Sequence, residues 1–138
     1  TGLFSEVRHT WLPAARFTSG VNGGYRLPYA PEHSFGLRAG WRHRRGFSLH
    51  IDGTQVGDQF GDNRQTVEGS ADGTTGRLPG YWVWNVAAGH EFRRERFGVN
   101  PFVTVKNLAD ERYISSRAPL GIQPGMFRQV NAGVKFRF

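Results

Sequence analysis

The chain has 138 residues, a net charge of +7 and no cysteine, and aromatic residues make up 14% of it within a hydrophobic content of only 38%. No window approaches the ~18 apolar residues of a membrane-spanning helix, and the lack of cysteine excludes a disulfide framework and a thiolate zinc site. Nineteen glycines indicate strands joined by glycine-rich loops. Any contact with a membrane would therefore be made through strands.

Apolar and polar residues alternate in several segments, and this pattern predicts strands because a strand points successive side chains to opposite sides. We expect about six strands of roughly 9–12 residues. They cover residues 2–12, 34–42, 47–56, 81–92, 97–106 and 127–138. The fold class is therefore all-β, an antiparallel meander in which each strand has one apolar and one polar wall.

Three irregularities interrupt the alternation. The phase is lost between Gly53 and Val56, which predicts a bulge and leaves the facing of the two residues between them open. Pro101 lacks a ladder donor, so a bulge or local unpairing is expected there. Phe102 falls on the polar side of its strand, where an aromatic residue is out of place.

The connections alternate between long and short. Residues 14–33, 57–80 and 107–126 carry many glycines and prolines, and the second of these loops is either an ordered flap or disordered. The short turns, 42–45 and 93–96, are rich in arginine, so the positive charge belongs mainly to one end of the structure. Outer-membrane barrels have long extracellular loops and tight periplasmic turns.

The last strand has an apolar wall that ends on two phenylalanines, and no residue follows Phe138. Such a wall suits lipid, with the polar wall facing the lumen of a barrel. An edge strand of a soluble sandwich is the alternative. The pattern resembles the C-terminal signal that hands bacterial barrels to their assembly machinery, and it consists of Asn131, Gly133, Phe136 and Phe138.

Several loop motifs, in order along the chain, resemble those of TonB-dependent outer-membrane receptors. Residues 106–113 read KNLADERY, similar to a recurring NLFDKxY element of that family, although Ala109 replaces its usual phenylalanine. Residues 27–33 read LPYAPEH and resemble a segment that precedes a barrel strand. Residues 59–62 and 76–85 are similar to the ferric-citrate-receptor branch of the family.

The resemblance implies a 22-stranded barrel, closed by an N-terminal plug, in the outer membrane of a Gram-negative bacterium. Residues 1–138 would be the C-terminal segment of that barrel, with the plug and the earlier strands absent. Such receptors import a ferric siderophore when the TonB complex acts on the plug, and the resemblance makes ferric citrate the candidate here. The implied partners are outer-membrane lipid, the remaining barrel and plug, the TonB complex and the barrel-assembly machinery. The segment itself would bind no cofactor.

Ferric citrate is an anion, and guanidinium groups suit carboxylates because they offer paired, planar donors. Arginines on the long loops are therefore candidate ligand contacts, with a glutamine as a neutral donor. The candidates are Arg64, Arg77, Arg117 and Gln123, with Arg16, Arg26 and Arg112 as further loop arginines. For each of these, a solvated or intraloop salt bridge is the competing interpretation.

No catalytic constellation is visible, so we expect no enzyme activity. The five histidines have no metal-ligand spacing, and no metal site is predicted. Two other classes remain as alternatives. One is a soluble all-β nucleic-acid-binding domain, disfavoured because Trp41, Trp82 and Trp84 lie on walls opposite the charged side chains. The other is a small structural or adhesive barrel, which would have to oligomerise because the smallest spanning barrels have about eight strands.

Overall fold

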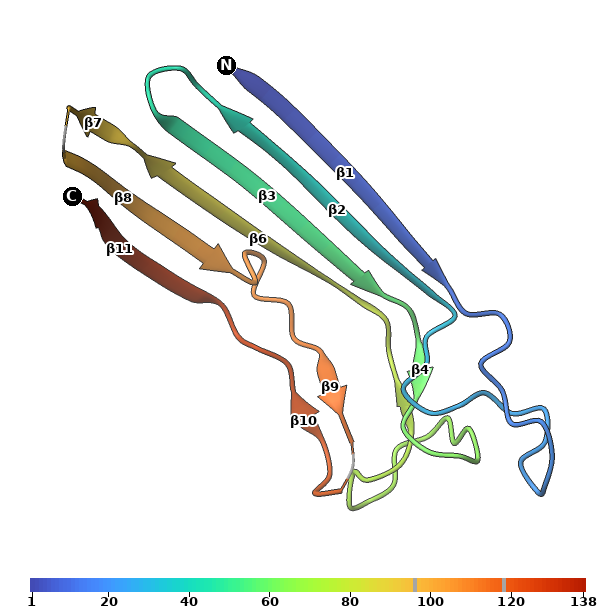
Figure 1. The fold of residues 1–138 in the computed structure, drawn as a ribbon. Helices are drawn as coiled ribbons and strands as arrows, with labels where there is room; N and C mark the ends of the chain where they lie inside the picture. Colours follow the sequence, from blue (N-terminus) through green and yellow to red (C-terminus); the bar gives the residue numbers. More distant parts are fainter. Residues whose placement is uncertain (96, 118) are drawn as a thin grey trace.

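A computed structural model describes residues 1–95, 97–117 and 119–138 of the chain. In this part of the chain the regular structure consists of strands, and the predicted all-β meander is confirmed (Figure 1). The long strands are β1 (Gly2–Trp11), β2 (His33–Arg42), β3 (Phe47–Val56), β6 (Tyr81–His90), β8 (Phe97–Lys106) and β11 (Gln129–Arg137). The short ones are β4 (Gln59–Phe60), β5 (Arg77–Leu78), β7 (Phe92–Arg94), β9 (Ile114–Ser116) and β10 (Gln123–Pro124).

The long strands form one antiparallel sheet in the order β1-β2-β3-β6-β8-β11, with β7 paired to β8. Across the strands, apolar residues pair with apolar residues and polar residues with polar ones. One row of facing residues consists of Ala39, Ile51, Val86, Val105 and Val130. The neighbouring row on the other face holds Glu6, Arg38, Asp52 and Asn85. The period-two pattern therefore produces an apolar wall and a charged wall.

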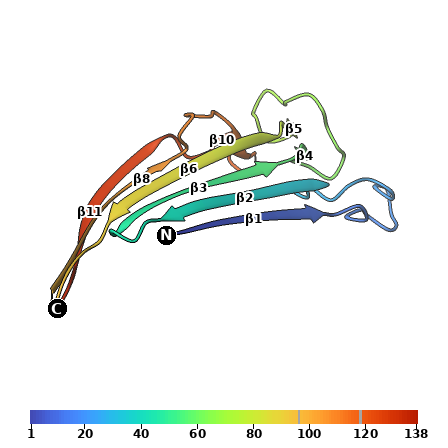
Figure 2. The same ribbon diagram turned by 90° about the horizontal axis from the view of Figure 1, so that it is seen from above.

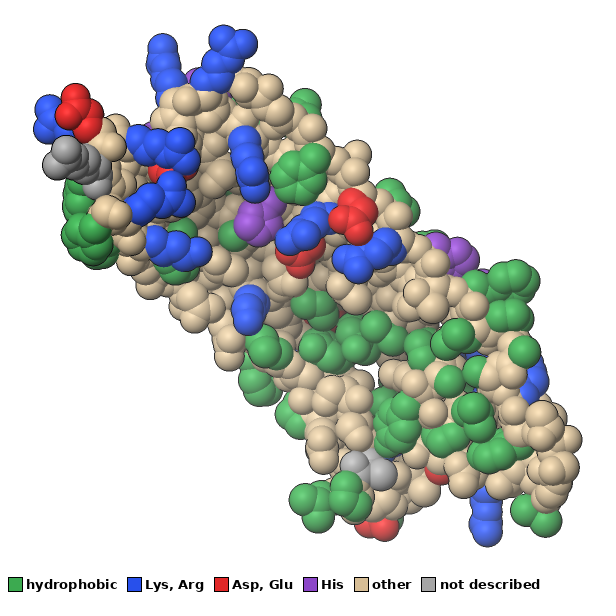
Figure 3. All heavy atoms as spheres, viewed as in Figure 1, with side chains coloured by type: hydrophobic (Ala, Val, Ile, Leu, Met, Phe, Trp, Pro, Cys, Tyr) green, Lys and Arg blue, Asp and Glu red, His purple; other side chains and the backbone are tan. Residues whose placement is uncertain are grey.

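The sheet is bent, and the charged wall lies on its concave side (Figures 2 and 3). On this wall the amide of Asn85 donates to Asp52 over 2.7 Å. The apolar wall leaves large side chains open, among them Leu3, Val7 and Val130, which are 84%, 70% and 66% exposed. Neither wall is covered by another layer of the described chain.

The predicted bulge at Gly53 is wrong. The pairing of β3 with both neighbours runs without a shift from Ser48 to Val56, so Thr54 faces the charged wall and Gln55 the apolar one. Gly53 breaks the apolar pattern because the ring of Trp84 lies against it, and a Cβ there would be 2.4 Å from that ring. A close aromatic contact, and not a slip in register, explains this glycine.

Pro101 interrupts the ladder as expected, without a bulge. Opposite it, β6 ends at His90 and β7 begins at Phe92, while the amide of Glu91 turns away and donates to Gly46 O over 2.9 Å. The register is the same on either side of this gap. The neighbouring Phe102 covers Gly133 on β11, where a Cβ would be 2.7 Å from its ring.

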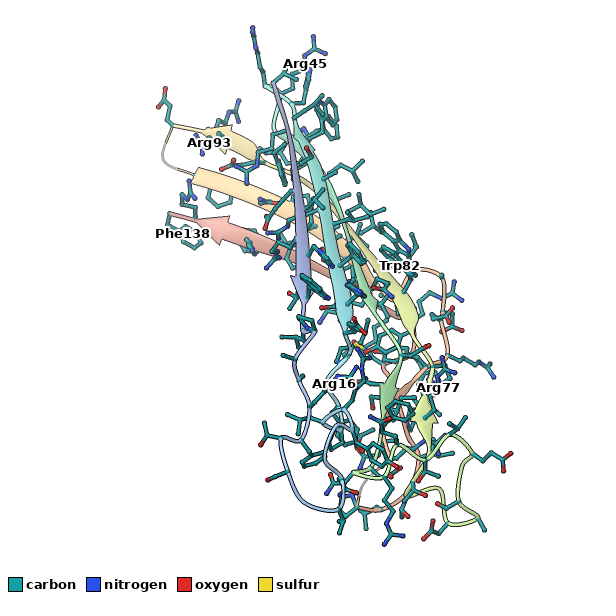
Figure 4. All side chains as sticks on the ribbon, turned by 90° about the vertical axis from the view of Figure 1, so that its right-hand side faces the viewer. Arg16, Arg45, Arg77, Trp82, Arg93 and Phe138 are labelled. Carbon is teal, nitrogen blue, oxygen red and sulfur yellow. The ribbon has the colours of Figure 1, made fainter. Side chains whose placement is uncertain are left out.

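The two ends of the sheet differ. The three long connections gather at one end, whereas both termini and the short turns lie at the other (Figures 1 and 4). The loop of residues 57–80 is ordered and contains the β4–β5 pair, which the sequence did not predict. The described residues contain no helix long and apolar enough to cross a membrane.

Candidate functional site: the loop cap

The three long connections pack on one another, and we call residues 12–32, 57–80, 107–117 and 119–128 together the loop cap. The first loop joins the second where the amide of Tyr29 donates to Phe60 O over 2.9 Å. The third joins the first where the amide of Arg117 donates to the hydroxyl of Tyr29 over 3.2 Å. The cap is therefore one folded unit and not three separate loops.

The cap has a small interior around Leu78 and Arg117. Leu78 is fully buried, and Arg117 is only 7% exposed. The guanidinium of Arg117 donates from Nε to Arg77 O and from Nη1 to Gly73 O, both over 3.3 Å. Gly61 leaves room for the arginine, since a Cβ there would be 3.3 Å from Arg117 Cδ. Arg117 thus connects the third loop to the second through backbone carbonyls.

Three aspartates shape the second loop as hydrogen-bond acceptors. Asp72 accepts from the Ser70 hydroxyl and from the amide and hydroxyl of Thr74, which lower its pKa to about 2. Burial raises the pKa of Asp62, but the donors around it more than offset this and lower the pKa overall. The amide of Gly80 lowers the pKa of Asp58, and its ion pair with Arg77 adds to the effect.

Asn107 closes the seam where β6 and β8 separate. It is 1% exposed and has φ of 49°, a left-handed conformation that asparagine tolerates better than most residues. Its amide nitrogen Nδ2 donates to Glu111 O and Met126 O, and Oδ1 accepts from the Glu111 amide. Its own backbone amide donates to Asn85 Oδ1 over 2.9 Å. Asn107 therefore joins both arms of the third loop to the sheet.

Tyr113 adds an aromatic contact beside this seam. Its ring stacks on Tyr81 with centroids 4.0 Å apart, and it lies so close to Gly125 that no side chain would fit there. Its hydroxyl accepts from the amide of Met126 over 3.3 Å. Tyr113, the last residue of the KNLADERY segment, thus holds the third loop against β6.

The predicted ligand contacts fall into two groups. Arg117 is buried in the cap, and Arg77 is ion-paired with Asp58, with 46% of its side chain exposed. Arg64 and Gln123 are exposed, and no partner of the Arg64 guanidinium is found among the described residues. The structure brings Arg77 and Arg117 together through the Arg77 carbonyl and leaves the other two apart. Whether any of the four touches a ligand stays a prediction.

The other loop arginines are partly engaged. Arg16 donates to Gly24 O over 2.9 Å, and Arg26 is ion-paired with Glu32. Within the described chain Arg112 is exposed and has no such partner. No group of three or more histidine, cysteine, aspartate or glutamate side chains is placed to hold a metal ion, as far as the described residues extend.

The residues of the C-terminal signal lie on β11 and just beyond it. Phe136 and Phe138 gather around Phe97, with ring centroids 6.2 and 5.8 Å from it. Gly133 lies under Phe102, and Asn131 faces Thr104 across the ladder. Phe138 is 95% exposed. Their role in assembly stays a prediction.

Sequence reasoning missed the residues that hold the cap together. Asn107 lies within a motif that was noted, but its four hydrogen bonds could not be read from spacing. Asp62 and Asp72 did have a signal, because an aspartate two to four residues before a threonine often accepts from its amide or hydroxyl. Nothing in the sequence pointed to Leu78, whose burial depends on contacts between distant loops.

A bent antiparallel meander with an outer apolar wall, a charged concave wall and long loops at one end defines a section of an outer-membrane barrel. A family model described as "TonB dependent receptor-like, beta-barrel" matches residues 5–108. The chain belongs to this family, whose members are transporters of the Gram-negative outer membrane.

Solved structures agree with this assignment. The ferric citrate transporter FecA, in its unliganded form, is similar with a TM-score of 0.77 and 28% identity over 86% of this chain. The ferric-catecholate import receptor Fiu of E. coli K12 is similar in its open form, with a TM-score of 0.61 and 25% identity over 80% of the chain. Its closed form, at 20% identity, has a TM-score of 0.69. The chain spans 16–18% of the length of these proteins.

Proposed function

We propose that the chain is the C-terminal part of the barrel of a siderophore receptor, and that ferric citrate is its first candidate ligand. The observation that carries the ligand class is the similarity to a ferric citrate transporter over most of the chain. In this proposal β11 pairs with the first strand of the barrel, and a plug fills the lumen against the charged wall. The TonB complex and the barrel-assembly machinery act on the complete receptor.

Within the cap we assign ligand contact to Arg64 and Gln123. Both are exposed, and the guanidinium of Arg64 is unpaired among the described residues, so it is available to a carboxylate. Arg77 is already ion-paired with Asp58, and Arg117 donates hydrogen bonds to backbone carbonyls of the cap. These two arginines would position the loops around the ligand.

The test uses the complete receptor with Arg64→Gln and Gln123→Ala combined. Loss of a charge-assisted pair costs about 1.5–3 kcal/mol, so ferric citrate should bind roughly ten- to hundredfold more weakly. Binding is measured with radioactive iron, alongside a neutral ferric hydroxamate that should be unaffected. Arg44→Gln, which removes an exposed arginine from the opposite end, should leave both affinities unchanged.

The function itself is tested by iron uptake in cells whose own citrate receptor is deleted. Expression of the complete receptor should restore uptake of ferric citrate, and it should stop when TonB is absent. Uptake of a ferric catecholate in place of the citrate would keep the receptor class and overturn the ligand. No uptake of any ferric complex would overturn the proposed function.

A further inference from the structure

The two short turns carry a basic cluster that the loop cap does not use. Residues 42–46 and 91–95 include five arginines against two glutamates. They lie at the end of the sheet opposite the cap, where Arg93 is seen near Phe138, and both Arg45 and Arg93 are far from Arg77 (Figure 4). The strand positions of these arginines determine which of them face the apolar wall.

Strand β7 separates two neighbouring arginines. Arg93 lies on the charged wall, where its Nε is 2.8 Å from Glu91 Oε1. Glu91 is also 3.7 Å from Arg137, so the carboxylate is held on that side. Arg94 lies on the opposite wall with Phe92, and it faces Phe97 across the ladder. A cation therefore lies at the edge of a wall that is otherwise apolar.

Arg45 reaches the same edge from the other turn. That turn is held by the amide of Gly46 donating to His43 O, and Gly46 O accepts from Glu91, which ties the turn to the start of β7. Arg45 is exposed. Neither Arg45 nor Arg94 has an ion-pair partner in the described parts of the chain.

The two arginines border one hollow of about 540 Å³, within the ~300–1,000 Å³ of small-ligand pockets. Its other lining consists of His90, Phe92, Phe97 and Val99 with the ion pair of Glu91 and Arg93. The ring of Phe97 contacts the rings of Phe136 and Phe138, so the hollow is continuous with the apolar wall. A ligand that fills this hollow must be both anionic and apolar.

We propose that Arg45 and Arg94 bind the phosphodiester of an anionic glycerophospholipid whose acyl chains lie along Phe92, Phe97 and Val99. A guanidinium matches phosphate oxygens through paired donors, and its aliphatic stem can lie on apolar surface while the charge stays at the lipid headgroups. Arg93 also lines the hollow, but its guanidinium is paired with Glu91 on the charged wall, so we do not count it among the phosphate ligands. The inference depends on the outer-membrane family and not on the ferric ligand.

The test is native mass spectrometry of the complete receptor in neutral detergent with added phosphatidylglycerol. Arg45→Gln combined with Arg94→Gln should lower the retained phosphatidylglycerol at least fivefold. The control, Arg42→Gln combined with Arg44→Gln, removes the same charge from the same end of the sheet at residues that do not line the hollow, and it should retain the lipid. Arg45→Lys with Arg94→Lys keeps the charge and should recover part of the binding.

Three results would overturn the proposal. The first is an equal loss of lipid in the double variant and its charge-matched control, and the second is unchanged lipid retention in the double variant. The third is displacement of the bound lipid by free phosphate at the concentration at which added phosphatidylglycerol competes. The first would mean a general attraction of the basic turns, and the last a plain anion site. Heat-modifiable migration on gels confirms that each variant is a folded barrel. Ferric ligand binding should be unchanged in all of them.

Discussion

The loop cap and the sheet solve the problem of burial in different ways. The cap has an interior of its own, in which Leu78, Asn107 and Arg117 are almost fully buried. The sheet, by contrast, leaves side chains on both of its walls uncovered. Its apolar wall must therefore be covered by lipid, and its charged wall must face the lumen of the barrel.

The difference shows where each region obtains its stability. Substitutions in the cap should act locally, because its hydrogen bonds begin and end within the chain. Substitutions on the apolar wall should act through insertion into the membrane, because that wall has no partner in the described structure.

Changing Phe138→Ser should have the largest effect, on the amount of receptor in the outer membrane. The terminal strand must pair and present its apolar wall to lipid, and Phe138 lies at the interface end of that wall. We expect at least a tenfold loss in outer-membrane fractions with unchanged synthesis. Phe127→Ser is the matched control, since Phe127 is 60% exposed in the cap, and it should retain more than half of the level. Similar losses in both would contradict a special role of the last residue.

Asn107→Ala should open the third loop. It removes three side-chain hydrogen bonds at a buried site and places alanine at a φ of 49°. We expect the local opening free energy to fall by about 3 kcal/mol. Hydrogen exchange of residues 107–127 measures this change. Asn107→Gly relieves the backbone strain but not the lost bonds, so it should recover only about 1 kcal/mol. Full recovery with glycine would show that the hydrogen bonds matter little.

Arg117→Met should loosen the contact between the second and third loops. The aliphatic part is kept, while bonds from a charged donor to two carbonyls are lost at a cost of roughly 2 kcal/mol. Faster hydrogen exchange around residues 73–78 is the expected readout. Arg64→Met, at an exposed site in the second loop, should leave the exchange of residues 73–78 unchanged. If Arg117→Met weakened ligand binding without faster exchange, Arg117 would be a ligand contact and not a support of the cap.

The smallest effect concerns the turn around Asp72. Its folded pKa is lowered to about 2 from an ordinary value of 3.8, so the carboxylate stabilises the turn above pH 4, and this contribution is lost as the pH falls through about 2. An environment-sensitive dye on Ala71→Cys should report a transition near pH 2. The same dye with Asp72→Asn should show no transition there, and a transition near pH 4 with Asp72 present would contradict the lowered pKa.

Sequence reasoning succeeded where structure depends on local periodicity. The ranges of the long strands and the walls of Trp41, Trp82 and Trp84 followed from alternation, and the interruption at Pro101 followed from its missing donor. It failed where contacts join distant segments. Gly53 was misread because Trp84 on the next strand explains it, and the burial of Arg117 depends on two other loops.

In the proposed barrel one wall of the sheet faces lipid and the other faces the lumen, and the lack of cysteine in this chain makes these orientations directly measurable. Spin labels are placed singly at Val103, Thr104 and Val105 of β8 in a complete receptor without other cysteines, in lipid vesicles. We predict that labels at Val103 and Val105 collide with dissolved oxygen, and that the label at Thr104 collides with a water-soluble nickel complex. Equal accessibility at all three positions, or the inverse pattern, would contradict the account.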